Sequence, residues 1–389
     1  MKVIIYGIGQ GREFVEKALK PEHEITAYMD SCAEITNYRG LPFYKPENLK
    51  FLKYDYMIIS VIDRKTAWQI MNYLTDEYAV DPERIIPFTC YTSNELYKVK
   101  MNSSSDEIKG LIFGNSHAMY GYIESFFDGG VINLSSSSQS LFYSYQIFKR
   151  CLSEYRKKLA GLNYIIIDLY DYNFFNSDIS LTRGLFDYIE WGGLIDPHNF
   201  RKNQSYKGSF EDELMREKRI LADLPVNKKQ IMHELFECTG SPKTQMTVES
   251  VNRRWGHITG REPLETDKFL GNVVQNRYEE TIRENITIFH EFIGEIRHYF
   301  PDCKIVVTLI PRYITMEKTL SFIMQDWKHE FEMIIYEAEK RFGIHYLNFK
   351  DLEEISGNTY FYYDICHLNT AGGQALTSVL NRKLEYGHE

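Results

Sequence analysis

Short apolar runs bounded by glycine or polar residues alternate with longer amphipathic stretches along the chain. A run of four to eight apolar, β-branched residues has the length of a buried strand, whereas a helix needs a longer, periodic stretch. In the first hundred residues this pattern gives a βαβ order, which is typical of a doubly wound parallel sheet. The predicted strands lie at residues 2–6, 24–29, 56–61 and 84–87, and the predicted helices begin at residue 12 and cover 65–77.

A polar stretch without apolar periodicity, residues 102–106, separates this alternation from a second one. Because 389 residues exceed one ordinary core, we expect two domains, residues 1–101 and 107–389. In the second domain, apolar residues recur at three- and four-residue steps over 278–299, which predicts a helix packed on a sheet. Its predicted strands lie at 110–114, 130–134, 164–169, 304–309 and 344–348, and a further helix is predicted at 317–341, ending at Gly343.

A long segment, residues 176–275, interrupts the second alternation. Insertions of this size in α/β enzymes usually build a lid or a specificity surface over the carboxyl edge of the sheet. We therefore expect a large, mainly helical insertion that contributes Trp191 or Trp255 to a substrate pocket. The predicted fold class is α/β, with a small Rossmann-like domain followed by a parallel-sheet domain that carries this insertion.

The composition narrows the classes of partner and compartment. Hydrophobic residues make up 43% and charged residues 25%, as in a globular protein with a real core. The net charge of −9 disfavours nucleic acid as a partner, because a phosphate backbone would be repelled. The six cysteines form no Cys-x-x-Cys pair, which argues against a zinc site and fits a reducing compartment. Without an apolar run long enough for a membrane span or a signal-peptide core, the predicted location is the cytoplasm.

Two short motifs at opposite ends of the second domain carry the candidate chemistry. Gly114-Asn115-Ser116-His117 follows a predicted buried strand, and Asp364-Ile365-Cys366-His367 lies near the end of the chain. A serine hydroxyl becomes a good nucleophile only when a neutral imidazole takes its proton, and that imidazole needs an acceptor on its other nitrogen. Each motif alone also has a structural explanation, since Ser116 could cap a helix and Asp364 could pair with His367 at the surface.

Together, the two motifs resemble those of the SGNH/GDSL hydrolase family. The resemblance implies a flavodoxin-like domain in which Ser116 is the nucleophile, His367 the base and Asp364 the residue that orients it. That family also binds the oxyanion with a glycine amide and an asparagine side chain. Asn173 is the best match to this asparagine, whereas the expected glycine is replaced by a serine within Ser135–Ser138.

His117 stands next to the predicted nucleophile. Because neighbouring residues at a helix start point apart, we expect its side chain to serve in packing or in a substrate contact. The remaining histidines have no metal-ligand spacing, so neither a metal nor a redox cofactor is expected.

The glycines of the first turn, Gly7, Gly9 and Gly11, resemble a dinucleotide fingerprint whose third glycine is displaced by one residue. Asp30 ends the second predicted strand, where an acidic side chain would meet a ribose hydroxyl. The region also resembles the small N-terminal domain of bacterial sugar acyltransferases and related polysaccharide-biosynthesis proteins, which implies a nucleotide or nucleotide sugar as a possible ligand. Equally, the turn needs glycine whether or not a phosphate binds.

These observations predict a serine esterase or O-acyltransferase that acts on an acylated carbohydrate or polysaccharide precursor. The alternative is a non-enzymatic nucleotide-sugar-binding protein in which the second domain is a degenerate hydrolase-like scaffold. The altered oxyanion motifs keep this alternative open, because loss of one such donor typically costs about 10²–10³ in rate.

Overall fold

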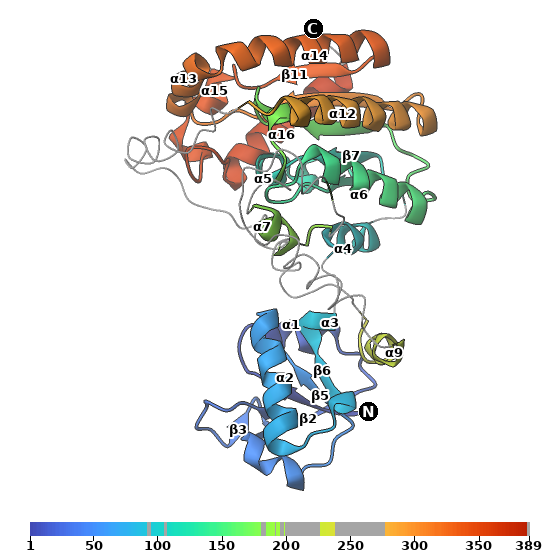
Figure 1. Ribbon diagram of the computed structural model, residues 1–389, viewed down its shortest axis with the longest axis vertical. Helices are drawn as coiled ribbons and strands as arrows, with labels where there is room; N and C mark the ends of the chain where they lie inside the picture. Colours follow the sequence, from blue (N-terminus) through green and yellow to red (C-terminus); the bar gives the residue numbers. More distant parts are fainter. Residues whose placement is uncertain are drawn as a thin grey trace. The chain divides into compact units, whose positions relative to one another are not determined.

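The computed structural model describes residues 1–91, 95–104, 107–179, 184–190, 192–194, 198, 226–237 and 277–386. The chain forms two compact units, one of Met1–Glu95 with Ser209–Met246 and one of Leu96–Gly208 with Thr247–Glu389. Both units combine a mainly parallel sheet with helices, which confirms the α/β class (Figure 1). The first unit ends before the expected boundary at residue 101, because helix α4 (Leu96–Ser103) belongs to the second unit.

The six-stranded sheet of the first unit has the order β3-β4-β2-β1-β5-β6. Its central strand β1 (Lys2–Tyr6) pairs in parallel with both neighbours. Alternate residues of β1 point into two separate hydrophobic clusters, with Val3 and Ile5 in one and Ile4 and Tyr6 in the other. Both faces of the sheet are therefore covered, which explains why its strands are continuous apolar runs. The other strands are β2 (Glu24–Met29), β3 (Asn37–Tyr38), β4 (Leu41–Tyr44), β5 (Tyr56–Ile59) and β6 (Ile85–Pro87).

Helix α9 (Val226–Leu235) lies within the predicted insertion but packs in the first unit. Its Met232 and Leu235 join the hydrophobic cluster that contains Val3, together with the following residue Phe236. The ammonium of Lys228 donates to the carbonyl oxygens of Pro82 and Glu83, at 2.9 and 2.6 Å. The sequence analysis placed this part of the chain in the second domain. It instead completes the core of the first unit.

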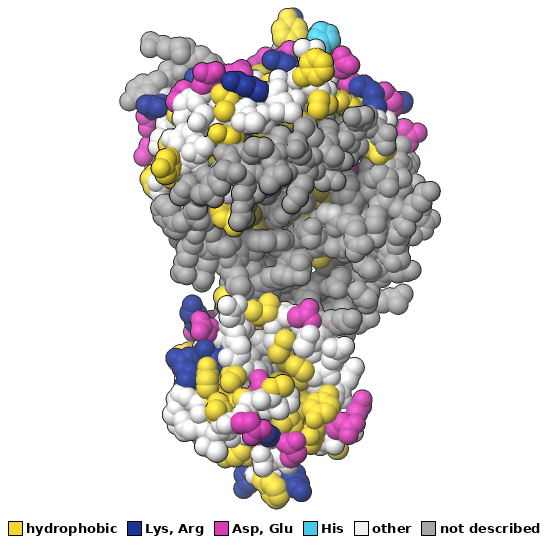
Figure 2. All heavy atoms as spheres, turned by 90° about the vertical axis from the view of Figure 1, so that its left-hand side faces the viewer, with side chains coloured by type: hydrophobic (Ala, Val, Ile, Leu, Met, Phe, Trp, Pro, Cys, Tyr) yellow, Lys and Arg dark blue, Asp and Glu magenta, His cyan; other side chains and the backbone are white. Residues whose placement is uncertain are grey.

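In the described residues of this unit, α9 is accompanied by the α-helices α1 (Gly11–Ala18), α2 (Arg64–Tyr78) and α3 (Phe88–Tyr91). On the face of the first unit seen in Figure 2, hydrophobic side chains are interspersed with charged ones.

The five-stranded sheet of the second unit is entirely parallel and has the order β11-β10-β9-β7-β8. The first strand of the unit thus lies between the second and the third, as in flavodoxin-like folds, and the chain reverses its direction of winding between β7 and β9. Side chains that follow these two strands lie at the edge where open α/β sheets bind ligands. The strands are β7 (Gly110–Phe113), β8 (Val131–Asn133), β9 (Tyr164–Asp168), β10 (Lys304–Leu309) and β11 (His345–Asn348).

The long helix α12 (Glu279–Tyr299) follows the predicted stripe closely and packs against α6 (Leu141–Glu154). Ile282, Phe289, Ile293 and Ile296 of the stripe are all buried, whereas Ile286 is half-buried. None of the helices in the described ranges could span a membrane, since none combines sufficient length with sufficient apolar character.

The single helix predicted at 317–341 is two helices, α13 (Ile314–Ile323) and α14 (Gln325–Phe342), which meet at Met324. Gly343 ends α14 with a φ of 64°, as expected for a left-handed cap. Within the described ranges, the unit also contains the α-helices α5 (Ser116–Gly121), α7 (Gly184–Glu190), α15 (Glu353–Ser356) and α16 (Thr370–Tyr386).

We predict that Gly11→Ala strongly destabilises the first unit. A Cβ at Gly11 would lie 1.8 Å from the carbonyl oxygen of Ser60, a backbone atom that cannot rotate away. The free energy of unfolding should fall by about 3 kcal/mol, at the upper end for overpacked sites. Urea denaturation of the full chain, followed by circular dichroism, measures it. The matched control is Gly9→Ala, since a Cβ at Gly9 meets nothing within 4 Å. Equal effects of the two substitutions would contradict the prediction.

Candidate functional site

Ser116 is the first residue of α5 and directly follows the turn that ends β7. Asn115 caps this helix, because its side-chain oxygen accepts a hydrogen bond from the backbone N–H of His117 at 2.9 Å. The interpretation of Ser116 as the helix cap is therefore wrong. Its hydroxyl is left for another partner.

Asp364 and His367 lie in the loop between the short 3₁₀ helix Thr359–Phe361 and α16. One carboxylate oxygen of Asp364 accepts the backbone N–H groups of Cys366 and His367, at 2.9 and 2.7 Å. The backbone N–H of Tyr363 donates to the carbonyl oxygen of His367 at 2.9 Å. These bonds fold the loop back on itself and hold the imidazole beside the carboxylate.

The two motifs meet in one hydrogen-bonded chain. The Ser116 hydroxyl lies 2.9 Å from Nε2 of His367, and Nδ1 of His367 lies 3.0 Å from both carboxylate oxygens of Asp364. Burial by itself would raise the pKa of Asp364, but the bonds and charge of His367 and the bond from Cys366 N–H lower it. An ionised Asp364 favours the tautomer with a proton on Nδ1, which leaves Nε2 to accept the Ser116 proton.

The two predicted oxyanion donors, Asn173 and the Ser135–Ser138 segment, come from separate loops of the second unit. Asn173 precedes the 3₁₀ helix Phe174–Asn176, and within the described ranges no hydrogen bond joins its side chain to Ser116, Asp364 or His367. In the loop after β8, the backbone N–H of Ser136 donates to the carbonyl oxygen of Gly114 at 3.4 Å. This contact brings the Ser135–Ser138 segment next to the turn that carries Ser116.

A buried cluster of four charged residues was not anticipated from the sequence. Arg312 donates to Asp171 at 2.7 Å and to Glu317 at 3.0 Å, and Lys350 lies 2.8 Å from Glu317. All four side chains are at most 15% exposed. Burial alone would raise the pKa values of Asp171 and Glu317, but Arg312 and Lys350 lower them. The cluster lines a cavity of about 300 Å³ between β9, α13 and the chain after β11. The residues lie too far apart in the sequence for a motif search to link them.

The His117 side chain, expected to serve in packing or in a substrate contact, packs between two other rings. Its ring stacks on the imidazole of His367, with the ring centroids 4.3 Å apart and the planes 17° from parallel. On the other side it stacks on Tyr170, at 3.5 Å and 23°. His367, which comes from a distant loop, therefore contacts both Ser116 and the residue that follows it.

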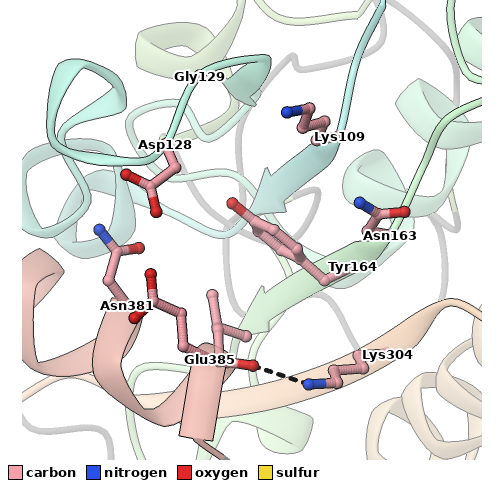
Figure 3. Close-up of a pocket in the computed structure, with 9 residues that line it drawn as sticks. Lys109, Asp128, Gly129, Asn163, Tyr164, Lys304, Asn381 and Glu385 are labelled. Atoms are coloured by element: carbon pink, nitrogen blue, oxygen red, sulfur yellow. Dashed lines mark hydrogen bonds between the residues drawn. The ribbon is translucent and has the colours of Figure 1, made fainter.

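A second cavity, of about 310 Å³, lies at the opposite edge of the same sheet. Its lining comes from the residues at the starts of β7, β9 and β10 and from the end of α16 (Figure 3). Lys304 spans part of it and donates to the carbonyl oxygen of Leu384 at 2.7 Å. The amino-terminal edge of a parallel sheet is not the usual site of ligand binding in such folds. We assign no role to this cavity.

The glycines predicted to bind a nucleotide, Gly7, Gly9 and Gly11, form the turn between β1 and α1. Gly7 has a φ of 96°, which glycine adopts without strain, and its N–H donates to the carbonyl oxygen of Met29 at 2.8 Å. Asp30 follows β2, so it lies at the same sheet edge as the turn. One of its carboxylate oxygens accepts the N–H of Cys32 at 2.9 Å. Trp191 and Trp255, predicted to line the substrate pocket, lie outside the described residues.

Among known protein families, a match is found for the first unit. Residues 1–86 match the family described as C2185-like, N-terminal. A solved structure described as "a putative platelet activating factor from Streptococcus pneumonia" is similar at 12% identity and a TM-score of 0.37, covering 83% of this chain and all of that one. At this TM-score the similarity carries no argument about fold or site. No curated protein matches.

Asp168, the last residue of β9, is 1% exposed and accepts the backbone N–H of Tyr170 at 3.1 Å. Burial raises its pKa to about 7, against the lowering effect of that bond and of the charge on Lys350. The folded protein therefore holds a proton on this carboxyl group at pH values where the unfolded chain has lost it.

We predict that Asp168→Asn removes a pH-dependent loss of stability. Between about pH 4 and pH 7 the folded state binds one proton more than the unfolded state, so the wild type loses stability as the pH rises. Relative to the variant, its free energy of unfolding should fall across this window and stay level above it. Urea denaturation of both proteins at pH 4.5, 6 and 8 measures this difference. Parallel curves would contradict the raised pKa of Asp168.

Proposed function

We propose that this chain is a serine esterase or O-acyltransferase in which Ser116, His367 and Asp364 form a catalytic triad. The observation that carries the proposal is the pair of contacts at His367, 2.9 Å to the Ser116 hydroxyl and 3.0 Å to the Asp364 carboxylate. These distances are those that a nucleophile, its general base and an orienting acid require. The position of Ser116 at the reversal point of the sheet gives further support.

The mechanism that this arrangement supports is a two-step acyl transfer. The Ser116 oxygen attacks the carbonyl carbon of an ester while Nε2 of His367 takes its proton, and the same imidazole then protonates the departing alcohol. Asp364 stabilises the imidazolium that forms in between. Water or a sugar hydroxyl, deprotonated by His367, next attacks the acyl-enzyme and releases Ser116.

The negative charge on the tetrahedral intermediate needs hydrogen-bond donors. The Ser116 amide, which opens α5, is the first candidate, and the positive end of the helix dipole lies at the same place. An amide of the Ser135–Ser138 loop is the second, since this loop is bonded to Gly114. The side-chain amide of Asn173 is the third.

The proposed substrate is an acylated carbohydrate or polysaccharide precursor. This class rests on the resemblance of the first unit to the N-terminal domain of sugar acyltransferases and on the aromatic surroundings of the triad. Tyr120 stands one helical turn after Ser116 on α5, and its ring meets His367 edge-on, with centroids 5.9 Å apart. A half-buried tyrosine in this position offers an apolar body with a polar tip to a sugar ring. A cytoplasmic location is part of the proposal, based on free cysteines.

A non-enzymatic binding protein is the second candidate function. The Ser135–Ser138 segment favours it, because serine replaces the expected glycine and the Ser136 N–H already donates to the carbonyl oxygen of Gly114. In that case the second unit would keep the fold and the serine without turning over an ester.

We predict that a fluorophosphonate probe labels the wild-type protein on Ser116. The Ser116 oxygen forms a bond to phosphorus, fluoride leaves, and the proton passes to His367. Ser116→Ala should abolish labelling, and His367→Ala should slow it by at least about 10⁴-fold, since triad residues act as a unit. Mass spectrometry of the labelled peptide identifies the site.

The matched control is Ser125→Ala, an exposed serine outside the triad, which should label like the wild type. Labelling that persists in Ser116→Ala would show that another serine is the nucleophile. A wild-type protein that no fluorophosphonate labels would favour the binding-protein alternative.

A further inference from the structure

We propose that His117 is a positioning residue whose ring face holds the His367 imidazole and stabilises the imidazolium that forms during acyl transfer. This inference rests on the proposed function of the triad. It assigns to a residue beside the nucleophile a role that acts through the general base.

The geometry sets His117 apart from an ordinary core residue. It directly follows Ser116 on α5 and is 7% exposed. Its ring lies between those of Tyr170 and His367, and the three planes are within 23° of parallel for each neighbouring pair. The face of His367 is thus covered by a flat ring, while its two nitrogens face Ser116 and Asp364.

Hydrogen bonding fixes the orientation of the His117 ring. Its Nδ1 lies 2.9 Å from the side-chain oxygen of Asn115, an atom that can only accept, so Nδ1 carries the proton. The same oxygen caps α5. One side chain therefore aligns both the helix that begins with Ser116 and the ring that covers His367.

Tyr170, on the other side of His117, has an unfavourable backbone conformation. Its φ of 59° is uncommon for a residue with a large side chain, and a side-chain oxygen of Asp168 stabilises this conformation by accepting its N–H. The guanidinium of Arg312 lies 5.2 Å from the Tyr170 ring centroid, and Lys350 lies 5.6 Å from it. The charged cluster thus supports the stack from the side away from the triad.

The chemistry gives the flat face a use beyond packing. Rotation of a histidine ring about its bond to Cβ covers a wide range of angles. The two hydrogen bonds in the ring plane of His367 leave some of this rotation free, and a flat ring stacked on its face restricts it. When His367 takes the Ser116 proton it becomes a cation, and an aromatic face within about 6 Å attracts a cation. At 4.3 Å the His117 ring meets this condition. The attraction appears only after proton transfer, so it favours the transition state over the resting enzyme.

The test compares flat with non-flat side chains at residue 117. His117→Phe keeps an aromatic ring face. His117→Leu fills the space but has no ring. His117→Gln also has no ring, but it keeps a hydrogen-bond donor for Asn115. With a fluorophosphonate, we expect the maximal labelling rate of the Leu and Gln variants to fall about tenfold, with an unchanged half-saturating concentration. The Phe variant should stay within about twofold of the wild type. His298→Leu, on the exposed side of α12, is the matched control and should label normally.

The outcomes separate this proposal from the proposed function. If the wild type labels on Ser116 but the Leu, Gln and Phe variants label at the same rate, His117 only fills space and the inference is overturned. If the half-saturating concentration rises while the maximal rate holds, His117 contacts the probe, and the positioning role is likewise overturned. Absence of Ser116 labelling in the wild type overturns both proposals. Circular dichroism confirms folding, and the Gln variant carries the comparison if the Leu variant does not fold.

Discussion

The close approach of three chain segments at Gly114 determines where Ser116 can lie. A Cβ at this residue would be 2.6 Å from the Cβ of Ala118 and 3.0 Å from that of Asp168. Because Gly114 has no side chain, α5 can start immediately after β7 and pack close to the end of β9. The turn thereby presents Ser116 at the reversal point of the sheet, and α16, which packs against α5, brings the preceding loop with His367 to the same edge. A larger residue at 114 would collide with Ala118 and Asp168 and displace the start of α5.

Behind this turn, several buried charged groups lie close together and bond to one another. Arg312 and Lys350 share Asp171 and Glu317, so that four charges lie together where an unpaired one would be very costly. In the part of the chain that the structure describes, no basic side chain lies within hydrogen-bond distance of Asp168, and burial raises its pKa to about 7. The Tyr170 and His117 rings fill the space between this cluster and His367. Ser116, His367 and Asp364 are thus held by ring packing as well as by hydrogen bonds.

The first unit is assembled from two separate segments of the chain, so a single domain boundary does not describe it. Its sheet and its glycine turn follow from the apolar runs, and its core includes α9, a helix far along the sequence. The apolar residues Met232, Leu235 and Phe236 cover a surface that the first 95 residues leave open. No local pattern in α9 indicates which of the two cores it covers.

The sequence by itself determined the α/β class, most strands of the two sheets and the positions of Ser116, Asp364 and His367 within their local motifs. The short strands β3 and β4 at the edge of the first sheet were not predicted. These features depend on residues close together in the chain, such as the buried apolar runs or the three-residue step from Asp364 to His367. Only the tertiary structure decided the contacts that join distant segments. Ser116 and His367 are 251 positions apart, and the Arg312 cluster and the His117 stack also span long separations. Such contacts depend on helix packing and on the mutual compensation of buried charges, and neither leaves a periodic signal in the chain.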